Sequence, residues 1–271
     1  MTDTMFSINV VGARGRMGIA LIQAIMASED LTLGSAVDRS GGPGIGQDAG
    51  RIAGIPDLGI RVTDDLAPQR GSIVVDFSLP EATANNIRIC HEQGIPLVLG
   101  TTGLSQETEA LLVEASRTIP VVFAANFSVG VTVLSRLAGV AAKALGPKWD
   151  AEMFELHHRH KRDAPSGTAL RIGHAVATAT ERNFEDVVVT TRSGSKQQRQ
   201  DKQIGVIGLR GGDSVGEHTL MFLADGERIE LIHRAGDRGI FARGALRAAR
   251  WASGAKPGLY DMVDVLGLTH L

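Results

Sequence analysis

Hydrophobic and polar residues follow two different patterns along this chain of 271 residues. Up to residue 127, short apolar runs rich in Val, Ile and Leu alternate with longer segments whose apolar residues recur at helical spacing. The short runs predict strands at 6–11, 31–37, 73–77, 97–99 and 120–123. The longer segments predict helices at 19–26, 80–93 and 106–117. Strands and helices in alternation indicate a doubly wound parallel sheet, which is a Rossmann-like α/β fold.

Beyond residue 127 the pattern changes, because several strands follow one another with few helices between them. Helices are expected at 131–145, 166–180 and 240–252. Strands are expected at 152–156, 187–191, 204–210, 217–223 and 228–235. Asp225-Gly226, between the last two strands, favours a hairpin turn. We therefore expect a C-terminal α+β domain with a mixed or antiparallel sheet.

The change of pattern predicts a domain boundary, with one domain at 1–128 and a second at 129–238. The remaining segment, 239–271, contains a helix and a closing segment, and its pattern does not say which domain it joins. Residues 39–58 are rich in glycine and have no period, which predicts a surface loop.

Two serines precede predicted helices of the N-terminal part. Ser78, with Pro80 in the first turn, is expected to cap the helix at 80–93, and Ser105 the helix at 106–117.

The first predicted strand runs into a glycine-rich loop, Gly12-Ala-Arg-Gly-Arg-Met-Gly18, and a helix follows. In a dinucleotide-binding loop one glycine makes the turn, a second admits the pyrophosphate, and a third lets helix and strand pack closely. The spacing here is G-x-x-G-x-x-G, so the order of strand, loop and helix carries the argument. Asp38 ends the second strand, twenty residues beyond Gly18, where a carboxylate can bind a ribose hydroxyl. Arg39 could instead bind a 2′-phosphate, so both NADH and NADPH are indicated as cofactors.

Ligands of doubly wound sheets bind at the carboxyl ends of the strands. Four predicted loops reach that edge, and each taken singly could equally be an ordinary turn. The candidate nucleotide-binding residues are Gly12, Ala13, Arg14, Gly15, Arg16, Met17, Asp38, Arg39, Gly100, Thr101, Thr102, Ala124, Ala125, Asn126 and Phe127.

A second candidate site is the run from His157 to Arg162, which holds three histidines and three cationic side chains. Like charges repel, so an anionic ligand would explain their clustering. The helix predicted after Ser166 would add the N–H groups of Gly167 and Thr168. A histidine here is also suited to proton transfer near neutral pH.

A solvated basic turn is the plainer interpretation of the same run. A metal site built from its histidines is disfavoured, because the neighbouring cations would repel a divalent ion and no Cys, Asp or Glu has ligand spacing. We therefore expect no metal.

Composition narrows the class of protein. Lys and Arg total 28 against 30 Asp and Glu, a net charge of −2, which gives no general attraction to nucleic acid or acidic membranes. The single Cys90 excludes an internal disulfide. No apolar run approaches the roughly 18 residues of a membrane helix, and the N-terminus lacks the features of a signal peptide. A cytoplasmic protein without nucleic-acid or membrane partners is expected.

The motifs together resemble the 4-hydroxy-tetrahydrodipicolinate reductases, also called dihydrodipicolinate reductases. The resemblance spans nearly the whole chain, and the histidine-lysine segment is its most specific part. It rests on these segments: 11–18, 100–103, 123–131, Glu155-Leu-His-His-Arg-His-Lys161, Ala164-Pro-Ser-Gly-Thr-Ala-Leu170, Val215-Gly-Glu-His218, 241–245 and 258–262.

The resemblance implies reduction of a cyclic dicarboxylate to tetrahydrodipicolinate with NADH or NADPH, on the diaminopimelate route to lysine. It implies that His157 and Lys161 are catalytic, with His157 as the expected proton donor, although which of the two delivers the proton stays open. His158, Gly167 and Thr168 would bind substrate carboxylates, and the nucleotide candidates named above fall on the family's nucleotide positions.

The resemblance also implies that the domain 129–238 binds substrate and that its sheet assembles a homotetramer. It further implies that the segment 239–271 completes the nucleotide domain. One departure is Asp38, where many members carry Glu, so the balance between NADH and NADPH stays open.

Two rival functions remain to be weighed. A semialdehyde dehydrogenase shares the two-domain plan but needs a cysteine nucleophile, and Cys90 falls within a predicted helix. A nucleotide-sensing regulator would bind the cofactor without turnover, and it has no need of His157, Lys161 and the Gly167-Thr168 helix start together.

Overall fold

The computed structural model describes residues 5–194 and 198–270. They divide into two compact units, each with its own core. The N-terminal unit runs to Val129 and takes in Arg238–Gly267, and the C-terminal unit comprises Gly130–Asp237 and the residues from Leu268. The helices of the described chain include none that is long and apolar enough to cross a bilayer.

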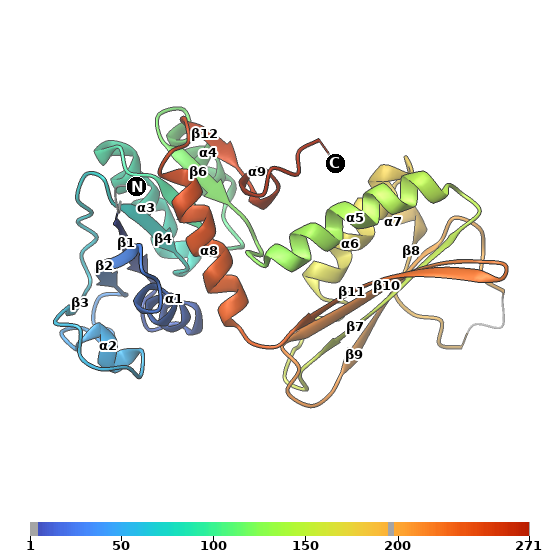
Figure 1. The fold of residues 1–271 in the computed structure, drawn as a ribbon, viewed down its shortest axis with the longest axis horizontal. Coiled ribbons are helices and arrows are strands. Elements are labelled where there is room, and N and C mark those ends of the chain that lie inside the picture. Colours follow the sequence, from blue (N-terminus) through green and yellow to red (C-terminus); the bar gives the residue numbers. More distant parts are fainter. Residues whose placement is uncertain (1–4, 195–197, 271) are drawn as a thin grey trace. The chain divides into compact units, whose positions relative to one another are not determined.

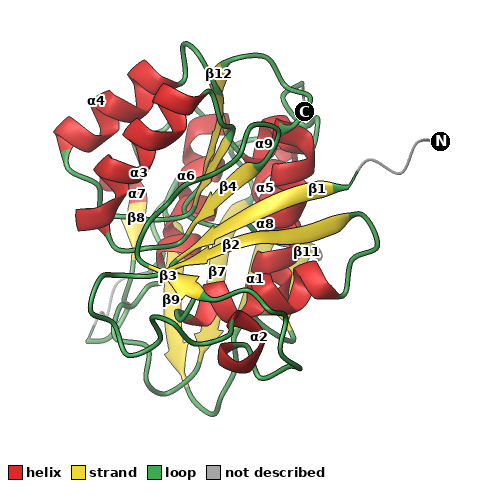
Figure 2. Ribbon diagram, turned by 90° about the vertical axis from the view of Figure 1, so that its left-hand side faces the viewer, coloured by secondary structure: helices red, strands yellow, loops and turns green. Residues whose placement is uncertain are grey.

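The N-terminal unit is built on a seven-stranded parallel sheet, seen in Figures 1 and 2. Its strands are β1 (Phe6–Val11), β2 (Leu31–Val37), β3 (Val62–Thr63), β4 (Ile73–Asp76), β5 (Leu97–Leu99), β6 (Pro120–Phe123) and β12 (Gly258–Tyr260). Their order is β12-β6-β5-β4-β1-β2-β3, and the pairs are parallel. The central strands β4 and β5 are buried on both faces and, apart from Asp76, consist of Val, Ile and Leu, as a covered parallel sheet requires. The predicted Rossmann-like fold is confirmed.

Two layers of helices cover this sheet. They are α1 (Arg16–Met26), α2 (Ala49–Ile52), α3 (Pro80–Gln93), α4 (Gln106–Ala115), α8 (Gly239–Ala252) and α9 (Met262–Val265). One cluster of buried residues includes the apolar faces of α1 and α8, and a separate cluster includes those of α3 and α4. Helix α8, although late in the sequence, therefore packs in the N-terminal unit, where Arg250 also pairs with Asp30 at 2.6 Å.

Two local predictions in this unit are wrong. The predicted loop 39–58 contains the short helix α2, which the Asp48 side chain organises by accepting N–H bonds from Gly50 and Leu58. Ser78 does not cap α3, because Leu79 is the N-cap residue and makes no side-chain bond there. The Ser105 cap is confirmed, since its hydroxyl accepts from the N–H of Thr108 at 3.3 Å.

The C-terminal unit has a mixed five-stranded sheet, confirming the predicted α+β class. Its strands are β7 (Asp150–His157), β8 (Val188–Val189), β9 (Ile204–Arg210), β10 (Gly216–Ala224) and β11 (Glu227–Ala235), in the order β11-β10-β7-β9-β8. The strand expected at 187–191 is shorter, because α7 (Phe184–Val187) takes its start. The hairpin between β10 and β11 forms at Asp225-Gly226, as predicted.

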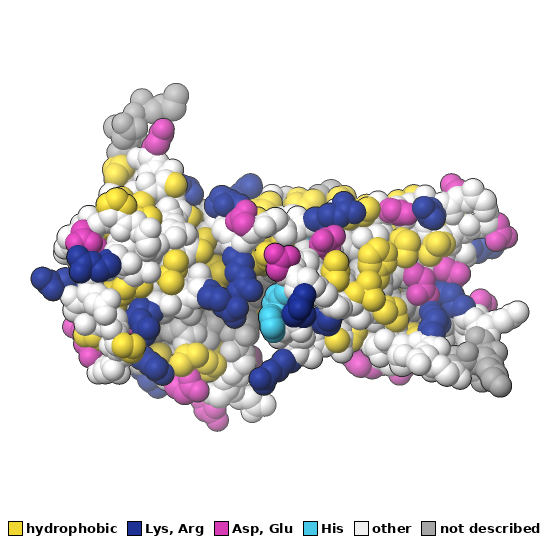
Figure 3. Space-filling view, turned by 90° about the horizontal axis from the view of Figure 1, so that it is seen from below, with side chains coloured by type: hydrophobic (Ala, Val, Ile, Leu, Met, Phe, Trp, Pro, Cys, Tyr) yellow, Lys and Arg dark blue, Asp and Glu magenta, His cyan; other side chains and the backbone are white. Residues whose placement is uncertain are grey.

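One face of this second sheet packs against α5 (Val129–Leu145) and α6 (Gly167–Ala179). Residues with alternate numbers on β7, such as Ala151 and Met153, point to the helices and are buried. The opposite face carries exposed apolar side chains, including Phe154, Leu209 and Ile232. Figure 3 shows hydrophobic side chains gathered over this sheet, with charged side chains around them.

Candidate active site

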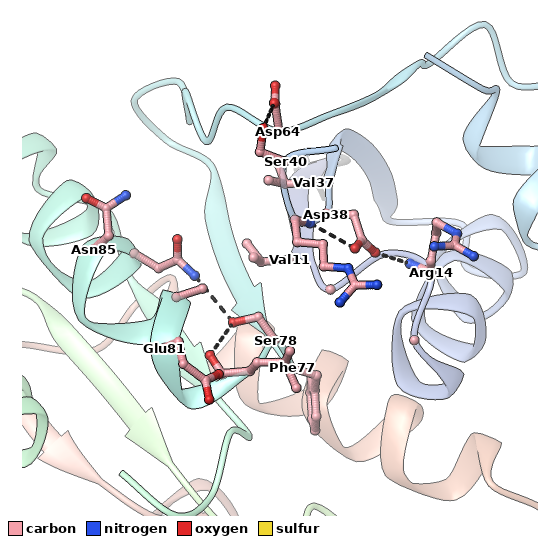
Figure 4. A pocket seen from close by; sticks show the side chains of 16 residues that line it. Val11, Arg14, Val37, Asp38, Ser40, Asp64, Phe77, Ser78, Glu81 and Asn85 are labelled. Carbon is pink, nitrogen blue, oxygen red and sulfur yellow. Dashed lines mark hydrogen bonds between the residues drawn. The ribbon is translucent and has the colours of Figure 1, made fainter. Parts of the chain in front are cut away.

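A cavity of about 730 Å³ lies at the carboxyl ends of β1, β2 and β4 in the N-terminal unit (Figure 4). Parallel strands of a doubly wound sheet present their ligand sites at this edge. Its wall includes five of the predicted nucleotide residues: Gly12, Arg14, Gly15, Asp38 and Arg39. The size and position of the cavity suit a nucleotide.

The glycine loop has the backbone geometry that its spacing suggests. Gly12 has φ +82°, and a β-carbon there would lie 2.7 Å from the carbonyl oxygen of Phe77. Gly15 is the N-cap residue of α1, and its lack of a side chain leaves the helix N-terminus open to an anion. A β-carbon at Gly18 would overlap the backbone of Gly12, so this glycine permits the close contact of α1 with the loop.

Asp38 joins the end of β2 to the glycine loop. One carboxylate oxygen accepts the N–H of Arg14 and the other accepts the N–H of Arg39, both at 2.8 Å (Figure 4). A carboxylate has about four acceptor positions, so two backbone bonds leave capacity for ribose hydroxyls. The side chains of Arg14 and Arg39 line the same cavity, which puts two cations beside this carboxylate.

Sequence reasoning missed one wall of the cavity. It comprises Ser40, Asp64, Phe77, Ser78, Leu79, Glu81, Ala82, Asn85 and Asn86. Most of these residues follow β4, so the rule that located the other loops could have found them. Asp76 positions this wall, because its buried carboxylate accepts from the N–H of Ser78 at 2.7 Å and from the amide of Asn86 at 2.8 Å. Burial raises the pKa of Asp76, and these hydrogen bonds oppose the rise.

The other predicted nucleotide residues, all within the described chain, are not part of that wall. They are Ala13, Arg16, Met17, Gly100, Thr101, Thr102, Ala124, Ala125, Asn126 and Phe127. Phe77 connects two of their loops to the cavity. Its ring contacts Phe127 edge to face, with centroids 5.4 Å apart, and a β-carbon at Gly100 would overlap the same ring. Thr101 adds a hydrogen bond of 3.1 Å from its hydroxyl to the carbonyl of Ser78.

Two of those residues have side chains that serve the core. Ala13 is fully buried and Phe127 is 1% exposed, so neither side chain faces a ligand. Arg16, in contrast, is exposed and lies near Arg238, where burial and the charge of Arg16 lower the pKa of the Arg238 guanidinium. Arg238 was not predicted, and its position just before α8 gave no sequence signal.

The second candidate site lies in the C-terminal unit, where β7 ends at His157. The residues after it form a turn held by backbone bonds, from His158 N–H to Ser214 at 2.8 Å and from Lys161 N–H to His158 at 3.0 Å. Ser166 then caps α6, its hydroxyl accepting from Ala169 N–H at 3.2 Å. The turn and the helix start are therefore adjacent in one structure.

A buried carboxylate lies behind this turn. Glu155 is fully buried, and its Oε2 lies 2.5 Å from Nδ1 of His157. Arg210 binds both oxygens of Glu155, at 2.8 and 2.9 Å, and the N–H of Ser166 binds one of them at 3.0 Å. Burial would raise the pKa of Glu155, but the bonds from His157, Arg210 and Ser166 outweigh it and hold the pKa at about 2.

The predicted substrate residues lie in this turn and at the start of α6. Lys161 is half-buried, and its Nζ lies 2.9 Å from a carboxylate oxygen of Asp163. Gly167 is exposed at the first residue of α6, followed by Thr168. The arrangement offers cations, helix N–H groups and an imidazole, which together can bind carboxylates and move a proton.

His218 was quoted from sequence only as part of a motif, and the structure shows it beside His157. It is 3% exposed, its ring centroid lies 5.4 Å from that of His157, and its Nδ1 is buried without a hydrogen-bond partner. Burial, reinforced by the charge of His157, lowers the pKa of His218 to about 4. This imidazole is therefore neutral at pH 7.

Two alternative chemistries find no support. Cys90 is buried in α3, and burial raises the pKa of its thiol, which is the opposite of what a nucleophile requires. Among residues 5–194 and 198–270, no three His, Cys, Asp or Glu side chains are grouped to hold a metal ion. The basic side chains of Arg192 and Arg199 bind Glu152, whose side chain leaves β7 on the face opposite Glu155.

Comparisons with known proteins agree over the whole chain. The family model for the N-terminus of dihydrodipicolinate reductase matches residues 6–127, and the model for its C-terminus matches 130–266. The chain is 50% identical to a 4-hydroxy-tetrahydrodipicolinate reductase of Anaeromyxobacter sp. (strain Fw109-5), over 97% of this chain and 98% of that one. It is 48% identical to the enzyme of that name from Hahella chejuensis (strain KCTC 2396), over 97% of this chain and 100% of that one.

A solved structure shows the same fold. It is the dipicolinate-bound dihydrodipicolinate reductase from Paenisporosarcina sp. TG-14, with a TM-score of 0.76 and 20% sequence identity. The match covers 96% of this chain and 98% of that one.

Proposed function

The chain belongs to the dihydrodipicolinate reductase family, and we propose that it reduces 4-hydroxy-tetrahydrodipicolinate to tetrahydrodipicolinate with hydride from a nicotinamide cofactor. The reaction belongs to the diaminopimelate route to lysine, and we expect it in the cytoplasm. The observation that carries the proposal is the end of β7, where the buried carboxylate of Glu155 binds both His157 and the N–H of Ser166 at the start of α6. The turn between these two residues carries Lys161.

The N-terminal unit is the proposed nucleotide domain, completed by 238–267, and the cavity at its sheet edge fits a dinucleotide. Gly12 and Gly15 leave room for a pyrophosphate, the first turn of α1 offers N–H groups, and Asp38 accepts ribose hydroxyls. A bound reduced nicotinamide supplies the hydride. The loops at Gly100–Thr102 and Ala124–Phe127, connected to the cavity by Phe77, are proposed for the nicotinamide end.

The C-terminal unit is the proposed substrate domain. A dicarboxylate needs two anion sites, which Lys161, His158 and the N–H groups of Gly167 and Thr168 can supply. Hydride addition to a conjugated imine leaves an enamine, which must take up a proton at carbon. We propose that His157 donates this proton, and that Lys161, whose charge is held by Asp163, binds the substrate and stabilises negative charge.

Both cofactors are proposed to be accepted. Asp38 suits the hydroxyl of NADH, whereas the side chains of Arg14 and Arg39 at the same cavity suit the 2′-phosphate of NADPH. Arg39→Ala should lower kcat/KM for NADPH roughly tenfold and change that for NADH little, since one phosphate contact is worth about 1.5–3 kcal/mol. Equal losses with both cofactors would show that Arg39 does not discriminate between them.

The reaction is tested by the loss of reduced-nicotinamide absorbance. Pyruvate and aspartate semialdehyde, freshly condensed by a synthase, provide the substrate, and the assay is run with NADH and NADPH in parallel. Oxidation that depends on the synthase is expected. His157→Ala should lower kcat about a hundredfold or more while cofactor binding is retained. Cofactor binding without oxidation by the wild type would favour the sensor function instead.

A homotetramer assembled through the C-terminal sheet is also proposed. The outer face of that sheet carries Phe154 at 39%, Leu209 at 46% and Ile232 at 42% exposure, an apolar surface that a second copy would cover (Figure 3). Light scattering with size-exclusion chromatography should give four times the chain mass. The same measurement on Leu209→Lys should give a smaller species, and an unchanged mass for this variant would argue against the interface.

A further inference from the structure

We propose that Glu155, held in place by Arg210, is the positioning residue of His157. It binds Nδ1–H of the imidazole, so that Nε2 is the nitrogen that presents the proton to the substrate. The inference rests on the proposed role of His157 as proton donor, and it assigns a purpose to a buried ion pair that substrate binding does not use.

Geometry supplies the first argument. Glu155 and His157 are alternate residues of β7, so their side chains leave the same face of the strand, and Oε2 reaches Nδ1 at 2.5 Å. Glu155 cannot turn away, because Arg210 binds both of its oxygens and Ser166 N–H binds one. A carboxylate fixed by two partners in this way fixes the ring that it binds.

Arg210 joins this pair to the basic turn. Its register partner across the parallel strands β7 and β9 is His157, and its guanidinium also donates to the backbone carbonyl of Asp163 at 2.5 Å. Arg210 therefore binds two things at once: the carboxylate of Glu155, and the backbone at Asp163, where the turn that carries Lys161 ends. The orientation of the proton donor and the position of the neighbouring cation depend on the same side chain.

The groups around His157 and His218 distinguish the two imidazoles. Glu155 is the anion that contacts the imidazole, and it is shared with the cation Arg210. His218 faces His157 from β10, with Lys161 and His233 also close enough to act on it, and burial keeps His218 neutral. Two adjacent imidazoles thus differ in role, because the carboxylate contacts His157 and not His218.

No side chain projects from Gly216 toward Nε2, the other ring nitrogen of His157. A β-carbon at Gly216 would lie 2.8 Å from Nε2 of His157, so the glycine keeps this nitrogen free of a side chain. With Nδ1–H bound to Glu155, the neutral ring has its lone pair at Nε2. That nitrogen takes up and releases the proton in each turnover.

The first test uses the wild-type protein and no substrate. Long-range ¹H–¹⁵N NMR spectra of ¹⁵N-histidine-labelled protein show which ring nitrogen carries the proton of a neutral imidazole, and His157→Asn assigns the signals. We expect neutral His157 to carry its proton on Nδ1. A neutral ring protonated on Nε2 overturns the proposal, whatever the protein reduces.

The second test uses Glu155→Gln, which keeps the shape and can still accept from Ser166 N–H. Glu152→Gln is the matched control, because Glu152 lies on the same strand and also pairs with arginines, Arg192 and Arg199, but on the other face. The assay is kcat for reduced-cofactor oxidation between pH 5 and 9, corrected for the active fraction by cofactor binding.

Glu155→Gln should lower kcat at pH 7.5 by about ten- to a hundredfold. Replacing the contacting carboxylate by a neutral amide removes an anion that stabilises a cationic ring, so the pH at which kcat falls to half should move down. Glu152→Gln should match the wild type in both. A loss of kcat in Glu155→Gln with the pH at which kcat falls to half unchanged would show a structural role only and refute positioning. If the wild type itself fails to oxidise the cofactor, the proposed function fails, and the NMR result still decides the pairing.

Discussion

The buried histidine His218 should make the stability of the C-terminal unit depend on pH above the range of the carboxylates. Its side chain is 3% exposed and leaves β10 on the same face as the core residues Leu220 and Phe222. Its Nδ1 has no hydrogen-bond partner, and Nε2 lies 3.4 Å from the hydroxyl of Ser166. Protonation would therefore place a charge in a buried position beside His157 and Lys161, where Glu155 offsets only part of the cost of desolvation.

The magnitude follows from the two pKa values. The pKa of His218 falls from 6.5 to about 4 on folding, so the folded state prefers the neutral ring. This contribution is fully present above pH 6.5 and is lost as the pH falls through about 4. At about 1.4 kcal/mol per pKa unit, the full contribution is roughly 3 kcal/mol, of which about 2 kcal/mol is lost between pH 7 and pH 5.

Urea unfolding at pH 7 and pH 5 measures this loss. Trp149 packs against the core of the C-terminal unit, so a Trp251→Phe background leaves one tryptophan that reports on it. His218→Leu removes the titrating group and the unpartnered Nδ1, and it should remove about 2 kcal/mol of the difference between the two pH values.

His174→Gln is the control in the same unit. His174 is half exposed on α6, and its replacement should leave the pH dependence as in the wild type. If His218→Leu retains the wild-type difference, then His218 is not the group that titrates, and the reasoning from its burial is wrong.

Two glycine substitutions test close packing at the two sites. Gly18→Ala should destabilise the N-terminal unit by about 1–3 kcal/mol, measured by Trp251 fluorescence in urea, because its β-carbon would overlap the backbone of Gly12; an unchanged midpoint would contradict this. Gly216→Ala should lower kcat at least several-fold at unchanged Kd for NADH, because its β-carbon would crowd Nε2 of His157; a wild-type kcat would show that this space is not used.

Most of the N-terminal fold could be predicted, because its strands are short apolar runs between helices of clear period. The exception at 39–58 has a physical reason. Helix α2 is only four residues long. It depends on Asp48 accepting N–H bonds from Leu58 and Gly59, which follow Asp48 by 10 and 11 residues in the sequence. No periodicity exists in so short a helix, so a pattern of hydrophobic residues could not reveal it.

The nucleotide cavity could be predicted in part. Gly12, Gly15 and Asp38 follow from the loop spacing and the strand end, since their roles depend on local backbone geometry. Phe77 was missed although it ends a predicted strand, where the rule for strand ends applies; its residue type alone does not indicate a ligand. Its importance comes from its contacts with Phe127 and Gly100, which the packing of separate loops creates.

The contacts of His157 with Glu155, and of Glu155 with Arg210, could be predicted from the sequence only in part. The strand pattern of β7 is enough to put Glu155 and His157 on one face, so their pairing was within reach. Arg210 was not, since it lies 55 residues from Glu155 and meets it only through the parallel register of β7 and β9. A shift of one residue in that register would turn Arg210 to the other face and leave Glu155 buried without its cation, at a cost of several kcal/mol. The ion pair therefore also selects the register of the strand that ends in His157, and replacing Arg210 should disturb both the donor and the sheet edge that carries it.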